Sequence, residues 1–521
     1  MKKRIKRKPT YKQMAFETAV RNPERYIGLL SAVKDFEGEI LNDETLLKIV
    51  SHLYVIGEVS SPEIEVNEQT TIDDISEQVE FVNSTRRADG GFPQGYASRF
   101  WTYMRTPSEL GFVYAQYGEK FQLSEIAKKL IKGEIDEQEA FSIQAMKYNR
   151  KSPYRNVSND FNFFRFILKL LLKLREKGSS LSYEQFIVAS FSKDGDADKM
   201  IKMLKNNKFK DFSDAYKFVK KEYGATTSQN TITKDYPDVV RRVLIISGFI
   251  TIRYSGKKLI QINENKLNYI NDLLNTDFQI TETEKTEAKS YFTKLNTKNT
   301  EFLKIAEKYR KEDVIIANEY TNKLFSIIKD YEIDEKIISE SIEKIGTRKH
   351  IIEEFKEIPE PLKLEFYISI LIALKYGQDF VIRPNYKADH IGKPYSHAPG
   401  NKGDIEVFSN AIYWLIEVTL IRNKTQQLNH ETTSVIRHLT TNEEFKNYID
   451  KYLSFVAPVI HTDTREFFDF SVINHRTKDY KVSIKPYSIN EFVETTLQKE
   501  NLSNMEKYTQ NVFDNFKNKL N

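Results

Sequence analysis

Residues 396–438 read SHAPGNKGDIEVFSNAIYWLIEVTLIRNKTQQLNHETTSVIRH, and this stretch decides the fold of the C-terminal part of the chain. Its segments IEVF and YWLIEVT are rich in β-branched and aromatic residues, and the turn SNA joins them, so they predict a β-hairpin. Asp404 lies at the mouth of the first strand, after a loop rich in Gly and Pro, and Glu417 lies in the second strand. Because a hairpin folds back on itself, we expect both carboxylates at one end of a sheet.

Two carboxylates at one end of a sheet form a candidate magnesium site. Mg²⁺ binds through carboxylates, water and phosphate oxygens, and a held ion activates water and neutralises charge on a scissile phosphate. A carboxylate inside the apolar run YWLIEVTLI is costly to bury unless it is paired or bound to metal. In the alternative interpretation, Glu417 lies on the solvated face of an edge strand and Asp404 is a loop acid. The pair by itself does not decide between the two.

Three further side chains are candidates for the same centre. Glu431 and His438 lie seven residues apart on a helix predicted directly after the hairpin, so they share one face, two turns apart. The alternative for them is a pair on a surface helix. Glu365 lies near the start of the apolar helix PLKLEFYISILIALKYG (361–377), where it either points toward the carboxylates or caps the helix.

The order of elements in residues 351–521 adds a fold to this chemistry. An acid-bearing helix, the Asp strand, the Glu strand, a further helix and the strand FVAPVI (455–460) follow one another. This is the core order of the PD-(D/E)xK nuclease fold, an α/β sandwich around a mixed sheet. We therefore predict a nuclease domain over 351–521.

Residues 1–150 contain a pattern typical of DNA-docking modules. In the stretch 106–134, a helix ends at Gly111, the strand FVYAQ and the turn YGEK follow, and a return strand leads into the helix SEIAKKLIKG. Helix, two-stranded wing and closing helix make up a winged helix-turn-helix. A small α+β subdomain with a hairpin is the alternative for this segment alone.

Residues 151–275 repeat this order of elements. Ser182 is placed to cap a helix beginning SYEQF, and Pro237 lies near the start of a helix that runs to Ile246. Gly248 ends that helix, and FITIRY, an SGKK turn and LIQIN predict a β-hairpin. A second winged module in one chain favours DNA binding.

Basic side chains on these modules are candidate DNA contacts, because phosphates are bound by Lys and Arg. Clustered cations are otherwise a solvated face, and the loop of residues 84–105 is otherwise a surface Ω-loop. The N-terminal candidates are Arg86, Arg87, Arg99 and Arg105, and those of the second module are Arg241, Arg242, Arg253, Lys257 and Lys258.

Length and composition narrow the class of protein. At 521 residues the chain predicts several domains, and residues 276–350 read as a charged, helical linker between recognition and nuclease parts. The absence of Cys excludes disulfides, Cys-ligated zinc and thiol catalysis. No apolar run is long enough to cross a membrane, and the basic start MKKRIKRKPTYK has no apolar signal region. It is a phosphate-touching arm or a solvated tail, and we expect a cytoplasmic protein.

The C-terminal residues resemble a known family. SHAPGNKGDIEV, IEVT, ETTSVIRH and FVAPVIH are similar to the catalytic domain of the AlwI-type family of type IIS restriction endonucleases, which has strand-nicking relatives. The segments 22–38 and 239–263 also look like family segments. The resemblance therefore covers most of the chain, and it is most specific in the catalytic stretch.

This resemblance implies a multidomain α+β protein with winged-helix DNA-recognition modules, a helical linker and a C-terminal PD-(D/E)xK domain. It implies that Asp404 and Glu417 bind Mg²⁺ and that Glu365, Glu431 and His438 support them. The family cuts double-stranded DNA a few base pairs from a short asymmetric site.

Thr419 stands where the general nuclease motif has Lys, as in the family's own pattern, which leaves open what orients the attacking water. His438 or a second metal ion could do so. Lys402 is another nearby cation, either a phosphate contact or a solvated side chain.

Several functions remain open at this level. A double-strand cutter that pairs its nuclease domains, a nicking enzyme, and the large subunit that joins a small nuclease subunit share these features. The same sequence is also compatible with a winged-helix binding protein whose C-terminal domain is inert, and with a metal hydrolase that is not a nuclease.

Overall fold

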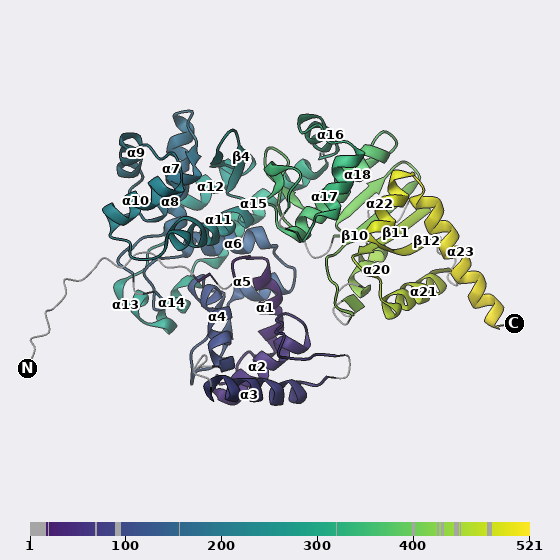
Figure 1. The fold of residues 1–521 in the computed structure, drawn as a ribbon, viewed down its shortest axis with the longest axis horizontal. Coiled ribbons are helices and arrows are strands. Elements are labelled where there is room, and N and C mark those ends of the chain that lie inside the picture. Colours follow the sequence, from purple (N-terminus) through teal and green to yellow (C-terminus); the bar gives the residue numbers. More distant parts are fainter. Residues whose placement is uncertain are drawn as a thin grey trace, which may run out of the picture. The chain divides into compact units, whose positions relative to one another are not determined.

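The structure is a computed structural model of the chain. It describes residues 17–520 except 19, 68–69, 89–94, 156, 319, 348, 399–401, 425–426, 429–431, 442–447, 449 and 477–481, and it leaves out the side chains of 83–88, 95–98, 311–318, 432–434, 440–441 and 520. The chain divides into two compact units, Met1–Lys308 and Tyr309–Asn521 (Figure 1). Among the described residues, no helix has the length and apolar character needed to cross a membrane.

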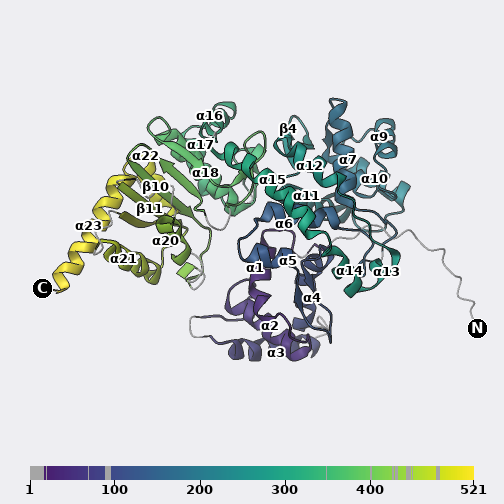
Figure 2. The ribbon, with the colours of Figure 1, turned by 180° about the vertical axis from the view of Figure 1, so that it is seen from behind.

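The N-terminal unit is mostly helical, with two small sheets (Figure 2). Its elements are α1 (Arg25–Val33), α2 (Asp43–Val55), α3 (Ile72–Ala88), α4 (Gly95–Glu109), β1 (Val113–Tyr114), β2 (Gln122–Leu123), α5 (Glu125–Ile131), α6 (Glu137–Lys147), α7 (Phe163–Glu176), β3 (Leu181–Ser182), α8 (Tyr183–Ser190), α9 (Ala197–Asn206), α10 (Phe212–Tyr223), α11 (Tyr236–Ile246), β4 (Ile250–Tyr254), β5 (Lys258–Ile262), α12 (Leu267–Asn275), α13 (Glu282–Thr286) and α14 (Ala288–Leu295). The helix α15 (Asn299–Asn318) runs across the division between the units.

The first predicted hairpin is present in this unit. Strands β1 and β2 pair antiparallel, and the segment 38–41 adds a third row through the bonds Gly38 N–H to Phe121 O (2.8 Å) and Phe121 N–H to Glu39 O (2.9 Å). Gly111 has φ +76°, and a Cβ there would meet the Leu295 side chain, so only Gly fits this turn between α4 and β1. The hairpin prediction for 112–123 is confirmed.

The second predicted hairpin is also present. Ser182 caps α8 in a capping box with Gln185, and Pro237 lies in the first turn of α11. Strands β4 and β5 pair antiparallel around a turn in which Gly256 has φ +66°, and β3 completes the sheet in the order β3–β5–β4. The sequence therefore predicted the helix, the turn and the hairpin of this region.

The C-terminal unit is a sheet covered by helices on both faces. Its elements are α16 (Tyr320–Asp330), α17 (Glu335–Glu343), α18 (Glu360–Tyr376), β6 (Val381–Pro384), β7 (Lys387–Ala388), β8 (Pro394–Ser396), β9 (Ile405–Phe408), β10 (Ile412–Val418), α20 (Thr432–Thr441), β11 (Asp450–Ala457), α21 (Thr462–Arg476), β12 (Val482–Ser488), α22 (Ile489–Leu497) and α23 (Asn501–Leu520). In the described residues, the strand order is β12–β11–β10–β9–β6. The molecule is thus mixed α+β, as predicted.

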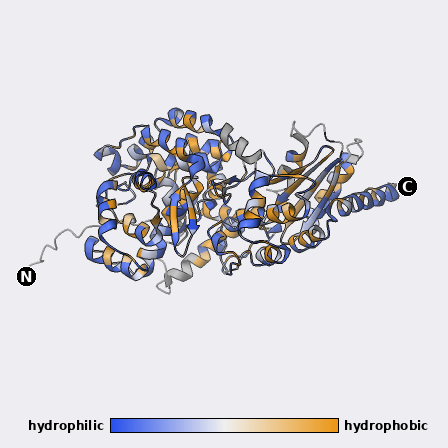
Figure 3. Cartoon of the chain, turned by 90° about the horizontal axis from the view of Figure 1, so that it is seen from above, coloured by the Kyte–Doolittle hydropathy of each residue, from blue (hydrophilic) through white to orange (hydrophobic). Residues whose placement is uncertain are grey.

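The sheet is mixed, because β9 runs antiparallel to both β6 and β10, whereas β10, β11 and β12 are parallel. Apolar residues line its strands, as their orange colour shows in Figure 3. One face buries Ile405, Trp414 and Ile416 with residues of α16, α17, α18 and α22. The other face buries Tyr413 and Leu415 with residues of α20 and α21. Alternate residues of each strand thus face opposite helical layers.

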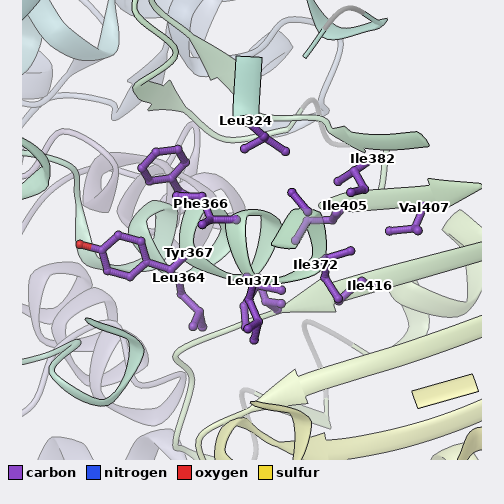
Figure 4. Packing of buried hydrophobic residues seen from close by; sticks show 14 of the residues in the cluster. Leu324, Leu364, Phe366, Tyr367, Leu371, Ile372, Ile382, Ile405, Val407 and Ile416 are labelled. Atoms are coloured by element: carbon purple, nitrogen blue, oxygen red, sulfur yellow. The ribbon is translucent and has the colours of Figure 1, made fainter. Parts of the chain in front are cut away.

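Helix α18 is the centre of the first layer. Pro361 lies in its first turn, and apolar residues surround the helix on all sides, so it is buried along most of its length. Figure 4 shows Ile372 of this helix beside Ile405 and Ile416 of the sheet. The prediction of a buried helix over 361–377 is confirmed.

The structure groups residues 276–350 differently from the predicted linker. Helices α13 and α14 belong to the N-terminal unit, whereas α16 and α17 belong to the C-terminal unit. Leu324, Ile338 and Ile342 of the latter pair lie in the same core as α18. The charged, helix-rich sequence predicted a connector and packing layer, and these apolar faces pack in the core of the C-terminal unit.

Candidate active site

Strands β9 and β10 bring Asp404 and Glu417 side by side. Ile405 pairs with Ile416 in the antiparallel register, so the next pair along is Asp404 with Glu417. The Val418 N–H donates to Asp404 Oδ2 at 2.8 Å, which holds the aspartate across the end of the hairpin. Opposed residues of an antiparallel pair point to the same face. Both carboxylates therefore face the layer of α20 and α21, with Asp404 half-buried and Glu417 buried.

A glycine allows these strands to approach each other. A Cβ built on Gly403 would lie 2.7 Å from Glu417 Oε1 and closer still to the Leu415 side chain. Any larger residue would therefore push into the carboxylate of Glu417. In the sequence, the only signal is a Gly directly before an Asp at the start of a strand. That this Gly lies against Glu417 can be seen only in the folded hairpin.

His438 bonds to one of the two carboxylates. It lies on α20, and its Nδ1 is 2.8 Å from Glu417 Oε1, with both side chains largely buried. Since an ionised carboxylate only accepts, the Nδ1–H is the donor, and the tautomer leaves Nε2 on the far side of the ring. The structure thus brings Glu417 and His438 together, and Glu431, the third predicted member, lies outside the described residues.

Glu365 forms a second acid–imidazole pair, which the sequence did not predict. Its Oε1 lies 2.5 Å from His397 Nδ1, and the carboxylate is buried in α18. Its Oε2 is buried and bonds to none of the described residues. His397 stands in the quoted stretch 396–438, but its partner is 32 residues earlier on a helix, so no local pattern revealed it. The alternative role of Glu365 as a helix cap does not fit, because its side chain bonds to His397.

Asn385 ties β6 to the start of β9. Its backbone N–H donates to Asp404 O at 2.9 Å, and its Nδ2 donates to Gly403 O at 2.7 Å. Both bonds fix the backbone on which Asp404 stands. Nothing in the sequence around Asn385 signalled this role.

The sheet beside the two carboxylates contains further buried polar groups. The pKa of the Tyr413 hydroxyl lies well above its usual value, first because burial opposes ionisation and then because the Glu406 and Glu417 carboxylates repel a phenolate. Glu406 is neutralised by Arg383, whose Nε donates to its Oε2 at 2.8 Å. The internal pairing of Glu406 therefore leaves Asp404 and Glu417 as the carboxylates at the mouth of the hairpin.

These residues fit a magnesium ion. The described residues contain no group of three or more His, Asp or Glu placed to hold a metal. Mg²⁺ does not need one, because it commonly binds through one or two carboxylates and takes its remaining ligands from water and substrate phosphate. Asp404 and Glu417 supply such a pair, and Thr419, in the place of the usual Lys, accepts the Ile421 N–H at 3.1 Å.

The predicted DNA contacts have varied surroundings. Arg253 and Lys257 are exposed on the second hairpin, and the half-exposed Lys258 lies over the Tyr183 ring at 4.2 Å. The remaining candidates lie on α3, α4 and α11. Arg86 and Arg87 have no described side chains, Arg99 donates to Tyr54 Oη (2.6 Å), Arg105 to Tyr154 O (3.1 Å), and Arg241 and Arg242 both bind Asp238.

No curated protein gives a significant match to the chain. Three solved structures align with it at low similarity. They are the small subunit of the heterodimeric restriction endonuclease R.BspD6I (22% identity, 34% of this chain, 88% of that chain, TM-score 0.26), the BpuJ1 endonuclease binding domain in complex with modified DNA (12%, 55%, 98%, 0.34) and restriction endonuclease FokI (13%, 94%, 96%, 0.23).

The family comparison is decisive. The model of the AlwI restriction endonuclease family matches residues 108–495, which include both hairpins and the whole β9–β10 edge. The matched stretch is well over half of the chain. The chain belongs to the AlwI restriction endonuclease family.

Proposed function

We propose that the chain is a type IIS endonuclease, which binds a short asymmetric DNA site and hydrolyses a phosphodiester a few base pairs away. The observation that carries this proposal is the placement of Asp404 opposite Glu417 at the end of β9–β10, with His438 bonded to Glu417. The order α18, β6, β9, β10, α20, β11 supports a PD-(D/E)xK centre.

The cofactor in this proposal is Mg²⁺ held by Asp404 and Glu417. When bound, the ion activates water and stabilises negative charge on the scissile phosphate. The low-dielectric surroundings of Glu417 strengthen any charge interaction at this edge.

The residues of the chain position the reacting groups. The Asp404 carboxylate is held by the Val418 N–H, and the backbone beneath it is held by Asn385. The His438 Nδ1–H donates a hydrogen bond to Glu417, so in this proposal its Nε2 would accept a proton from the attacking water. In this role the histidine replaces the Lys of the general motif, because Thr419 is engaged in the local turn.

Recognition is assigned to the N-terminal unit in this proposal. Its two sets of helices and hairpins, α1 to β2 and α7 to β5, have the element order of winged helices. Such modules bind double-stranded DNA, and the separation of cutting from recognition suits a type IIS enzyme.

Digestion of plasmid DNA tests the proposal. Purified full-length protein is incubated with supercoiled plasmid and Mg²⁺, and the product ends are mapped. We expect linear DNA whose ends lie at a fixed offset from one short sequence. The Asp404→Ala variant should give no product, whereas Asp463→Ala, which removes a half-exposed acid paired with Lys424, should cut normally.

Other products would change the assignment. Open-circular DNA as the end product would indicate strand-specific nicking, which also suits a large subunit awaiting a small nuclease partner. Cutting by wild type and Asp404→Ala at equal rates would place the chemistry elsewhere. Specific binding without any Mg²⁺-dependent product would overturn the nuclease proposal.

A further inference from the structure

Helix α11, which carries two of the predicted DNA contacts of the second module, is enclosed by protein. In α11 every residue is buried or half-buried, so its surface offers little to a groove. Arg241 is buried against Asp238, and Arg242 binds both Asp238 (2.8 Å) and Asn22 (2.7 Å). The pKa of Asp238 lies below its usual value, because the two guanidinium groups outweigh the effect of burial. The cations of α11 are therefore used inside the protein.

A strong positive charge lies elsewhere in the same module. The segment 202–221, which covers the second half of α9 and most of α10, contains seven lysines and two aspartates. Its net charge of +5 equals that of the whole chain. All seven lysines are exposed: Lys202, Lys205, Lys208, Lys210, Lys217, Lys220 and Lys221. We call these seven residues the lysine surface.

The helices direct the lysine surface outward. In α9 the buried residues are Ala197, Met200, Ile201 and Leu204, and in α10 they are Ala215, Val219 and Tyr223. Each set recurs every three or four residues, so each helix packs one face and exposes the other. On α10, Lys217, Lys220 and Lys221 have the spacing that places side chains on one exposed stripe.

The nearby acids do not neutralise these charges. Asp211 accepts the Asp214 N–H at 2.9 Å as the cap of α10, and Asp214 Oδ2 accepts the Lys210 N–H at 3.2 Å. None of the seven ammonium groups forms an ion pair with a described acid, whereas the neighbouring Lys199 is paired with Asp194. Helix-end electrostatics favour lysines in the last turn, but this accounts for Lys205, Lys220 and Lys221 alone.

We propose that the lysine surface binds the phosphate backbone of double-stranded DNA. Lysines on flexible stems are point charges that follow a phosphate row without reading sequence. The surface would therefore supply affinity and orientation, while base readout comes from other parts of the unit. This inference rests on the proposed function in one respect, namely that the ligand of the unit is duplex DNA.

Salt-dependent binding tests the inference. Binding of a fluorescent duplex of arbitrary sequence is measured for the full chain in EDTA, so that no cutting occurs, at about 50 to 200 mM salt. The variant K205Q/K217Q/K221Q removes three charges from the lysine surface. The matched control K34Q/K289Q/K304Q removes three exposed charges from other helices of the same unit. The substituted side chains are exposed in both variants, so both should fold.

Each lost phosphate contact lowers the slope of log K against log salt by about 0.9. We expect the lysine-surface variant to lose roughly 2.7 of slope and to bind at least about tenfold more weakly near 100 mM salt. The control should stay close to wild type. Unchanged slope and affinity in the lysine-surface variant, or an equal loss in both variants, would overturn the inference. Because the assay contains no metal, its failure is distinct from a failure to cut plasmid DNA.

Discussion

Two segments of this protein place charge inside an apolar run, and they use it in opposite ways. In YWLIEVTLI (413–421), Glu417 lies beside Asp404 and binds His438. In VVRRVLII (239–246), Arg241 and Arg242 both bind Asp238 of their own helix. Glu417 thus meets groups from other elements, whereas the two arginines are countered mainly by Asp238 of their own helix, with Asn22 as a further partner of Arg242.

The backbone explains this difference. A strand alternates its side chains between two faces. Glu417 therefore lies beside Asp404 of the neighbouring strand, on the face of the sheet that α20 covers. A helix that is enclosed by protein has no solvated face on which its cations could lie. These cations therefore need an acid nearby to neutralise them. A charged residue in an apolar run therefore marks a functional site only when its partner comes from another element.

The largest effect is expected at the strand. Glu417→Gln keeps the size of the side chain and removes its charge, so it removes half of the proposed metal ligands. DNA cleavage in single-turnover assays should fall by roughly 1,000-fold or more, while the circular dichroism spectrum stays unchanged. Cleavage within tenfold of wild type would mean that Glu417 does not bind the metal.

A somewhat smaller effect is expected at His438, which in the proposed mechanism accepts a proton and does not bind the metal. His438→Ala should slow cleavage by about 100-fold. Added imidazole should restore part of the rate, because the space left by the ring lies beside Glu417. A purely structural role of His438 would give no such rescue in the same single-turnover assay.

At the helix we expect a loss of stability instead of a loss of chemistry. Arg241→Met leaves Asp238 with a single cation, and breaking a buried ion pair costs about 3 kcal/mol. Hydrogen exchange of the α11 amides should report this loss. The exposed Arg253→Met is the control and should change stability by less than about 0.5 kcal/mol. If the α11 amides exchange at the same rate in the two variants, the charge on α11 does not stabilise the fold.

The smallest effect concerns another buried cation of the N-terminal unit. Lys147 is fully buried, donates to Asn299 Oδ1 at 2.7 Å, and has a pKa lowered to about 7 by burial. Above pH 7 the unfolded chain holds the proton that the folded one has lost, so this lysine makes stability rise with pH up to its usual pKa near 10.5.

Replacement of Lys147 tests this sign. The free energy of unfolding of Lys147→Met should exceed that of wild type by the largest amount at pH 6. This difference should shrink by about 1 kcal/mol per pH unit above pH 7. Thermal unfolding at several pH values measures the difference. An advantage that does not vary with pH would show that the lysine stays charged in the folded protein.

Local patterns predicted the elements better than their partners. The hairpin of Asp404 and Glu417 follows from strand composition and a short turn, and α18 follows from its largely apolar sequence. The Glu365–His397 bond joins residues 32 positions apart, and Asn385 reaches Gly403 over 18. Such contacts depend on the sheet order β12–β11–β10–β9–β6, which no local pattern encodes.

The cationic candidates show the same limit. The arginines of VVRRVLII suggested DNA contacts, because the sequence does not reveal that α11 is enclosed. The lysines of α9 and α10 do not stand out in the sequence, since a charge run is usually a solvated face. Only burial and pairing in three dimensions separate the internal cations from the exposed ones.

Binding of a divalent ion tests the central claim most directly. Titration calorimetry with Mn²⁺, in place of Mg²⁺, should give a binding heat for wild type and for Asp463→Ala. The Asp404→Ala and Glu417→Ala variants should each lose that heat, because in the proposed centre both carboxylates hold one ion. Unchanged Mn²⁺ binding by both variants would contradict a metal centre at the β9–β10 edge.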